Sequence, residues 1–318
     1  MLLCTLCGSY GLSEDSFICK LCGNNPGKSN SKWNKKVRQE IFDQATTDPS
    51  DGGECHINLY EKYIPFVCVS DLPEEVIYKK HPTELMESAV LHSIKMPEIE
   101  YSKSISVEGL SNCQIETLCY MLNAFDKDCN VDERMGFFLG DGTGCGKGRT
   151  IAGLFETLAK DGIMKHVWIS VSQDLKQDAE RDMNDVKSTL SIQSIRDNID
   201  DTNIVFMTYA NLISTMRYDE LCEWLGDDFD GCIVFDEAHK GKQCMGGNVS
   251  KTYLQMCKLQ DKYKRARIVY VSATGCSDVE NMGYMTRLGL WDKEKTFKSF
   301  VNTTKMSGEL SHEMIAIK

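Results

Sequence analysis

The sequence contains no apolar run that approaches the length of a membrane span. Its first residues, MLLCTLCG, are too few and too rich in cysteine for a secretory signal. It also contains no internal repeat of the kind that builds a solenoid. We therefore expect an intracellular protein of the cytoplasm or nucleus that is neither secreted nor associated with a membrane.

Basic charge is not in excess, since 36 Lys and Arg residues face 47 Asp and Glu residues, for a net charge of −11. This balance argues against a protein that coats nucleic acid generally. It does not exclude a nucleic-acid motor, whose contacts can be confined to one face of a cleft. With 42% hydrophobic and 26% charged residues over 318 positions, the composition is that of a globular protein. The length allows one large core, with or without a small satellite domain.

The chain contains 15 cysteines, and most follow no spacing pattern, so we interpret most of them as reduced thiols. The stretch CTLCGSYGLSEDSFICKLCG differs, because it holds two C-x-x-C pairs separated by eleven residues, each followed by glycine. Four thiolates in a tetrahedral array select Zn²⁺, and so short a segment needs the ion to fold. Disulfides or free thiols are the alternatives. We predict a zinc ribbon over residues 1–24, with ligands Cys4, Cys7, Cys19 and Cys22.

Residues 25–57 are rich in Gly, Ser, Asn and Lys, which is typical of a linker. From Lys20 to Arg38 this region and its edge carry basic residues with no acidic residue before Glu40, and Trp33 lies among them. The stretch is either an arm that contacts nucleic-acid phosphates, with one stacking side chain, or a solvated linker. The basic residues are Lys20, Lys28, Lys32, Lys35, Lys36 and Arg38.

Farther along, short β-branched and aromatic runs alternate with helical patterns. Nearly continuous apolar strands between helices predict an α/β domain with a mainly parallel sheet, covered by helices on both faces. Ligands of such sheets bind at the carboxyl ends of the strands. Ser277 and Glu280 form a capping-box pattern that predicts the start of the last helix. We expect strands at 135–140, 166–171, 203–209, 232–236 and 266–272, and helices at 147–160, 173–184, 219–225, 250–259 and 278–288.

The first of those strands leads into GDGTGCGKGRT, residues 140–150. Glycines let a loop turn its amides inward onto phosphates, the following helix adds its positive end, and Lys147 reaches the outer phosphates. A phosphate loop normally ends in Lys followed by Ser or Thr, whose hydroxyl binds magnesium, whereas Gly148 has no side chain. A glycine-rich turn without a ligand is the alternative, and the spacing does not fit a dinucleotide fingerprint.

The stretch CIVFDEAHK, residues 232–240, strengthens the nucleotide interpretation. A buried strand ends in Asp236, which can hold magnesium, and Glu237, which can orient or deprotonate the attacking water. His239 is placed to sense the phosphates. Ser272 and Thr274, in VYVSATG, follow another strand and can exchange hydrogen bonds with the acidic residues. A helix cap and an ordinary strand-to-helix turn are the alternatives for these two stretches.

With these motifs assembled, the chain resembles superfamily-two (DEAD/DEAH-like) helicase-type ATPases, and specifically the Strawberry notch family. LSNCQIETLCY is among the stretches that carry the resemblance, which covers some four fifths of the chain. The glycine loop alone is generic, but the loop together with SVSQDLKQDAERD and NMGYMTRLGLW is specific. It implies a family-specific extension at 58–105 and a first RecA-like ATP-binding lobe at 106–318. It assigns Gln114 to adenine, Asp236 to Mg²⁺, Glu237 and Lys147 to catalysis, and His239, Ser272 and Thr274 to coupling. The expected ATP site comprises Gln114, Gly142, Thr143, Gly144, Cys145, Gly146, Lys147, Gly148, Arg149 and Thr150.

Members of the resembled family carry the same Lys-Gly-Arg ending, so we interpret Gly148 as a family trait. Magnesium keeps several waters and needs few protein ligands, so the phosphates, Asp236 and water can complete its shell. Thr150 or Thr143 is a candidate for the missing hydroxyl. Superfamily-two motors also need a second RecA-like lobe that brings arginine fingers across the cleft. We expect that lobe in another or a longer chain, and slow ATP turnover by a single lobe.

Two functions follow from these expectations. The first is an ATP-hydrolysing, helicase-type motor lobe that acts on DNA or RNA, or within a transcription complex. The second is a nucleotide-gated scaffold or transcription co-regulator that has lost turnover. An intact Asp236-Glu237 pair favours the first, and the lack of a second lobe favours the second.

Overall fold

The computed structural model of the chain describes residues 60–63, 86–88, 105, 108–142, 144–242, 249–273, 279–291 and 296–306. The predicted zinc ribbon, the linker, Thr143 and Thr274 lie outside these ranges, so these predictions stay predictions. The chain divides into two compact units, and each is described by itself. In the smaller unit, strand β1 (Tyr60–Lys62) pairs antiparallel with β2 (Met86–Ser88).

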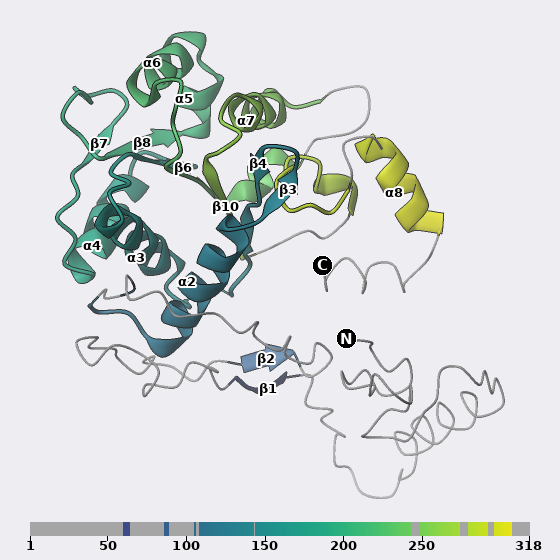
Figure 1. Cartoon of the computed structure of the whole chain (residues 1–318), viewed down its shortest axis with the longest axis horizontal. Helices are drawn as coiled ribbons and strands as arrows, with labels where there is room; N and C mark the ends of the chain where they lie inside the picture. Colours follow the sequence, from purple (N-terminus) through teal and green to yellow (C-terminus); the bar gives the residue numbers. More distant parts are fainter. Residues whose placement is uncertain are drawn as a thin grey trace, which may run out of the picture. The chain divides into compact units, whose positions relative to one another are not determined.

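The larger unit is built on a six-stranded sheet in which every neighbouring pair is parallel. The order across the sheet is β5-β10-β9-β6-β8-β7 (Figure 1). The expected mainly parallel sheet is therefore confirmed. The strands are β5 (Phe137–Leu139), β6 (His166–Ser170), β7 (Ile192–Ser194), β8 (Ile204–Thr208), β9 (Cys232–Asp236) and β10 (Arg267–Val271).

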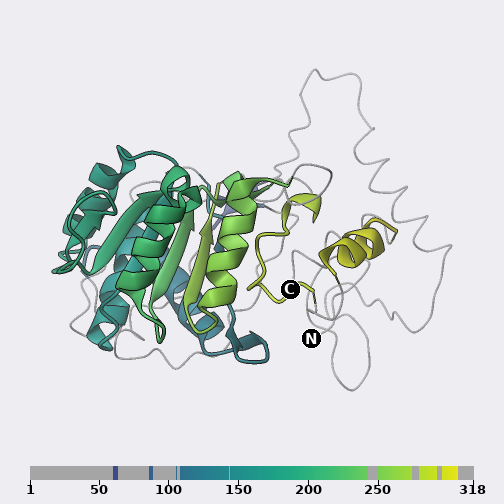
Figure 2. The ribbon, with the colours of Figure 1, turned by 90° about the horizontal axis from the view of Figure 1, so that it is seen from above.

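Helices cover both faces of this sheet (Figures 1 and 2). On one face lie α2 (Asn112–Phe125), α3 (Lys147–Lys160) and α4 (Leu175–Asp185). On the other lie α5 (Tyr209–Ile213), α6 (Thr215–Leu225) and α7 (Lys251–Lys262). The described helices also include α8 (Phe297–Met306) and the 3-10 helices η2 (Ala238–Gly241) and η3 (Val279–Asn281). Strands β3 (Asp128–Asn130) and β4 (Glu133–Arg134) pair antiparallel in a separate hairpin. None of the helices in the described ranges has the length and apolar character that a membrane crossing requires.

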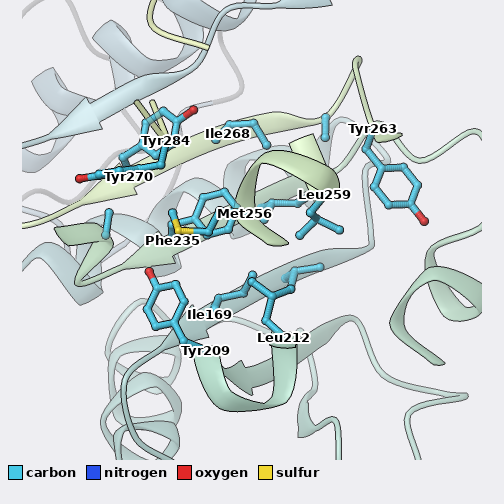
Figure 3. Packing of buried hydrophobic residues seen from close by; sticks show 14 of the residues in the cluster. Ile169, Tyr209, Leu212, Phe235, Met256, Leu259, Tyr263, Ile268, Tyr270 and Tyr284 are labelled. Carbon is cyan, nitrogen blue, oxygen red and sulfur yellow. The ribbon is translucent and has the colours of Figure 1, made fainter. Parts of the chain in front are cut away.

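Each face of the sheet buries its own hydrophobic cluster, because successive residues of a strand point to opposite faces. Trp168 of β6 packs in the cluster under α2 to α4, whereas its neighbours Val167 and Ile169 pack in the other. In the second cluster the rings of Phe235 and Tyr270 stack with centroids 6.0 Å apart (Figure 3). Strands buried on both faces explain why the sequence shows continuous apolar runs rather than alternation.

The five expected strands are all present, and the helix expected at 147–160 has those bounds. The helix expected at 278–288 is wrong, since η3 ends at Asn281 and turns follow it. Tertiary hydrogen bonds replace the helical ones there. The Arg287 N–H donates to the hydroxyl of Tyr270 at 3.2 Å, and the Arg287 carbonyl accepts from the N–H of Gly136 at 2.7 Å.

Candidate functional site

Three of the predicted motifs meet at the carboxyl edge of the sheet. Val271, the last residue of β10, pairs with Leu139 of β5 on one side and with Asp236 of β9 on the other. The glycine loop leaves β5 just after Leu139, and Ser272 follows Val271. The loop, the acidic pair and the hydroxyl residue therefore start from three adjacent strands, as expected for parallel strands.

The glycine loop has the backbone that its sequence predicts. Gly144 and Gly146 have φ values of +90° and +76°, in the left-handed region that glycine adopts without strain. A Cβ added at Gly142 or Gly144 would meet no atom within 4 Å, so the outer side of the loop is open. Helix α3 begins directly afterwards, and the N–H groups of its first three residues precede the first intrahelical hydrogen bond, which Thr150 donates to the Gly146 carbonyl. Such a loop and helix start fit an anion.

Lys147 folds its side chain over this loop. Its Nζ donates to the carbonyl oxygens of Asp141 at 2.9 Å and Gly142 at 3.0 Å. The ammonium group also lowers the pKa of the Asp141 carboxyl, which burial raises more strongly. The positive charge is therefore held at the mouth of the glycine loop.

Asp236 is held by two donors at the end of β9. Its Oδ2 accepts from the hydroxyl of Ser170 at 2.8 Å, and its Oδ1 accepts from the N–H of Glu237 at 3.0 Å. Burial raises the pKa of Asp236, and the Ser170 hydrogen bond and the Lys147 charge oppose that shift. The charge of Lys147 thus reaches Asp236, although burial is the larger influence on the pKa of that carboxyl.

Glu237 has a strained backbone, with φ of +50° and ψ of +46° in the left-handed region. Its Oε2 lies 3.1 Å from Nδ1 of His239. The same Nδ1 lies 3.2 Å from Oγ of Ser272, a side chain that is buried. Strain of this kind concentrates at functional positions, where the surrounding contacts maintain it. His239 thus contacts both the acidic pair and the residue after β10.

Gln114 contacts the glycine loop from α2. Its Nε2 donates to the carbonyl oxygens of Gly146 at 3.1 Å and Cys145 at 3.4 Å, and its Oε1 accepts from the N–H of Ser111 at 2.9 Å. Ser111 in turn accepts from the Gln114 N–H, which completes a capping box at the start of α2. Gln114 therefore joins α2 to the loop, and its contact with adenine stays a prediction.

The residues after Lys147 are arranged differently from the usual phosphate loop. A Cβ on Gly148 would lie closer than 3.0 Å to Oδ2 of Asp182, a residue of α4. The hydroxyl of Thr150 donates to the carbonyl of Gly146 at 3.3 Å, and its side chain is buried. Arg149 forms an ion pair with Asp185, also of α4. The described contacts of Thr150 and Arg149 are thus within α3 and with α4, and their roles toward the nucleotide stay predictions.

Three residues near the site were missed by the motif analysis. Ser170, at the end of β6, donates to Asp236, and the Tyr209 hydroxyl donates to the Asp236 carbonyl at 2.8 Å. Asp182 approaches Gly148 from α4, and burial raises its pKa to about 6. The pattern that pointed to Ser272, a hydroxyl residue at the end of a strand, also occurs at Ser170 and could have identified it. Asp182 carries no such signal, because its position depends on the packing of α4 against α3.

The donor set fits a magnesium–nucleotide complex. The loop offers helix N–H groups and an ammonium, which suit phosphates, and Asp236 offers carboxylate oxygen, which Mg²⁺ prefers. Within the described ranges, no group of three or more His, Cys, Asp or Glu residues has the arrangement of a metal site. The four cysteines predicted to bind zinc lie outside those ranges.

Comparison with protein families gives one match that covers most of the chain. Residues 80–318 match the family described as P-loop containing NTP hydrolase pore-1. The chain is 37% identical over 271 residues to Protein strawberry notch of Drosophila melanogaster, and the matched region covers 75% of this chain and 16% of that protein. It is 38% identical over 252 residues to Protein FORGETTER 1 of Arabidopsis thaliana, covering 72% of this chain and 20% of that protein. Homology to Strawberry notch proteins is confirmed, and the chain spans about a fifth of their length.

A solved structure supports the fold. The SWI2/SNF2 ATPase core of Sulfolobus solfataricus in complex with dsDNA matches with a TM-score of 0.50 and 18% sequence identity, covering 64% of this chain and 42% of that one. At this identity the likeness concerns the fold alone. Together with the family match, it supports the expected RecA-like P-loop fold.

Proposed function

The chain belongs to the P-loop containing NTP hydrolase family described above, and from this premise we propose that it binds ATP with Mg²⁺ and hydrolyses it. One observation carries the proposal. Val271 of β10 pairs with Leu139, after which the glycine loop leaves β5, and with Asp236 of β9, so the phosphate loop and the acidic pair share the space at one edge of the sheet. The open loop and the start of α3 add a site for the phosphates next to that space.

In this proposal the start of α3 binds the phosphates, and Lys147 moves from the carbonyls of Asp141 and Gly142 to the outer phosphates. Asp236, fixed by Ser170, would hold the cation, and the cation would supply positive charge beside the phosphates. Glu237 orients the attacking water and accepts its proton while the oxygen–phosphorus bond to ADP breaks. The ring of His239 connects Glu237 to Ser272, which couples this step to movement.

We further propose that the lobe works on nucleic acid, DNA or RNA, or in a transcription complex, with a second RecA-like lobe from another or a longer chain. The homology to Strawberry notch proteins and the fold shared with a DNA-bound ATPase core support this extension. The predicted zinc ribbon and basic arm would add nucleic-acid contacts. A strong fall of DNA affinity with salt that disappears on deletion of residues 1–40 supports the arm.

The test is phosphate release by the purified chain with and without nucleic acid, compared with Glu237→Gln. This variant keeps the shape of the side chain and loses the base, so we expect release to fall by about 10²–10⁴-fold while ATP affinity stays the same. A wild-type chain that binds ATP but releases phosphate no faster than the variant would instead identify a nucleotide-gated scaffold. A chain that binds no ATP would overturn the proposal.

A further inference from the structure

Position 148 lacks the group that a phosphate loop of this type uses to hold its cation. In the pattern G-x-x-x-x-G-K-[ST], the residue after the lysine places its hydroxyl on Mg²⁺. The Cα–Cβ direction at that position therefore points toward the place where the cation is bound. In this chain the lysine is followed by Gly148, so no side-chain oxygen comes from α3 at this point.

A carboxylate from another helix occupies that direction. A Cβ on Gly148 would lie within 3.0 Å of Oδ2 of Asp182 and at 3.1 Å from its Cγ. Real Cβ atoms essentially never approach an oxygen so closely, so any side chain at 148 would displace this carboxylate. The absence of a side chain at Gly148 thus makes room for the Asp182 carboxylate, so the side-chain oxygen at this point comes from α4 instead of α3.

The packing of the two helices fixes this arrangement. Arg149, next to Gly148, forms an ion pair with Asp185, which lies nearly one helical turn beyond Asp182 on α4. Farther along, the Ser188 hydroxyl donates to Glu156 of α3 at 2.7 Å. Both contacts lie on the C-terminal side of Asp182, and they hold the end of α4 and the residues that follow it against α3.

The carboxylate of Asp182 has no hydrogen-bond or close ion-pair partner among the described residues. The nearby charges of Arg181 and Arg149 act on it, but the Arg149 guanidinium itself is paired with Asp185. Asp182 is half-buried, and a partly desolvated carboxylate without a hydrogen-bond donor costs free energy, which a bound cation would offset. Mg²⁺ at phosphate sites commonly takes one or two carboxylates together with substrate phosphates and water.

We propose that Asp182 supplies the cation of the bound nucleotide with the oxygen ligand that residue 148 lacks. This inference rests on the proposed function, since it concerns the cation that accompanies ATP. It departs from the expectation for Thr150, whose hydroxyl is already bonded to the Gly146 carbonyl within α3. Asp182 and Asp236 then contribute carboxylates from two separate elements, α4 and β9.

The experiment measures Mn²⁺ binding, by electron paramagnetic resonance, to the full chain saturated with a non-hydrolysable ATP analogue. Affinity of the analogue is measured in parallel with EDTA present. We expect Asp182→Ala to weaken Mn²⁺ binding by at least about 10-fold, with analogue affinity in EDTA unchanged. Asp182→Asn keeps the shape of the side chain, and a smaller loss is expected because an amide oxygen is a weaker ligand.

Two further variants make the test specific. Asp178→Ala is the matched control, because Asp178 also lies on α4 but is exposed and paired with Arg181, and it should bind Mn²⁺ like the wild type. In the double variant Asp182→Ala with Gly148→Ser, space for the serine opens, and the new hydroxyl should recover part of the Mn²⁺ affinity.

The outcomes separate the two proposals. If the wild-type chain binds no analogue in either condition, the proposed function fails. If it binds the analogue and Mn²⁺, but Asp182→Ala and Asp182→Asn both retain wild-type Mn²⁺ affinity, the role of Asp182 is overturned and the proposed function stands. A loss on Thr150→Ala with none on Asp182→Ala would overturn it in the same way.

Discussion

Nδ1 of His239 lies 3.2 Å from Oγ of Ser272, so the histidine after the acidic pair contacts the residue that follows β10. The N–H of Ser272 donates to the carbonyl of Leu139, the residue from which the glycine loop departs. One serine therefore connects the loop strand to the acidic motif. This contact gives the predicted coupling role of Ser272 a structural basis.

Ser272→Ala removes the hydroxyl and leaves the backbone contact to Leu139. We expect ATP affinity close to that of the wild type, and a loss of any stimulation of hydrolysis by nucleic acid. The measurement is the rate of phosphate release from ATP as increasing amounts of DNA or RNA are added. Ser194→Ala is the control, because Ser194 is also buried at a strand end but lies at the far edge of the sheet. Equal stimulation in Ser272→Ala and Ser194→Ala would contradict the prediction.

Lys147→Ala should abolish ATP binding with little change in stability. Among the described residues the side chain bonds to two loop carbonyls alone, so its loss costs the fold little. It removes charge-assisted hydrogen bonds to the phosphates that are worth about 1.5–3 kcal/mol each. Equilibrium binding of a fluorescent ATP analogue measures the effect, and thermal unfolding measures stability. Lys160→Ala, at the other end of α3, serves as the control. Retained binding in Lys147→Ala would show that the glycine loop does not hold the phosphates.

His166 should make the domain sensitive to acid. Burial lowers its pKa to about 3, with a further contribution from Arg267, and the ring stacks on Phe155 at 4.5 Å. Because the unfolded chain binds the proton near pH 6.5 and the folded one does not, stability is lost as pH falls through the window from about 6.5 to about 3. At pH 5 the titration of His166 should lower the free energy of unfolding by about 2 kcal/mol relative to its value at pH 8.

His166→Asn removes the titrating group and isolates that contribution. Urea unfolding of both proteins at pH 8 and pH 5 checks it, since the wild type should lose about 2 kcal/mol more than the variant over this interval. An identical pH dependence in the two proteins would mean that His166 takes up its proton as readily in the folded state as in the unfolded state.

Arg287 is a buried cation held by main-chain oxygens, and its removal should be costly. Its guanidinium donates to the carbonyls of Gln260, Tyr263 and Lys264 around the end of α7, and to that of Arg134 in β4. Arg287→Ala removes four hydrogen bonds from a buried guanidinium. The carbonyls of Tyr263 and Lys264 keep the N–H groups of Ala266 and Arg134 as donors. Since hydrogen bonds to charged groups are worth about 1.5–3 kcal/mol each, we expect a loss of at least about 3 kcal/mol.

Urea denaturation measures that loss, and a surface arginine provides the comparison. Arg265 pairs with Asp128 while both side chains are about half exposed, so Arg265→Ala should cost less than about 1 kcal/mol. Similar losses in the two variants would show that the carbonyl contacts of Arg287 contribute little.

The sequence was sufficient for the strands and motifs, because a strand buried on both faces is a continuous apolar run, as in CIVFD before Asp236. It was insufficient where contacts between distant parts of the chain determine the local structure. The β7 strand is three residues long with Gln193 exposed, so it leaves almost no pattern. At 278–288 the local capping signal favoured a helix, but the backbone of Arg287 bonds to Tyr270 and Gly136 instead. Asp182 meets Gly148 only because α4 packs on α3.

The order of strands also bears on how the protein is made. β5 precedes the glycine loop, yet its partner in the sheet is β10, some 130 positions later in the chain. A ribosome that has translated only as far as Leu225 has produced the loop but neither β9 nor β10. Closing so distant a pairing is slow compared with local contacts. The proposed nucleotide site is therefore expected to be among the last parts of the domain to form during synthesis, after the strands that follow the loop have emerged.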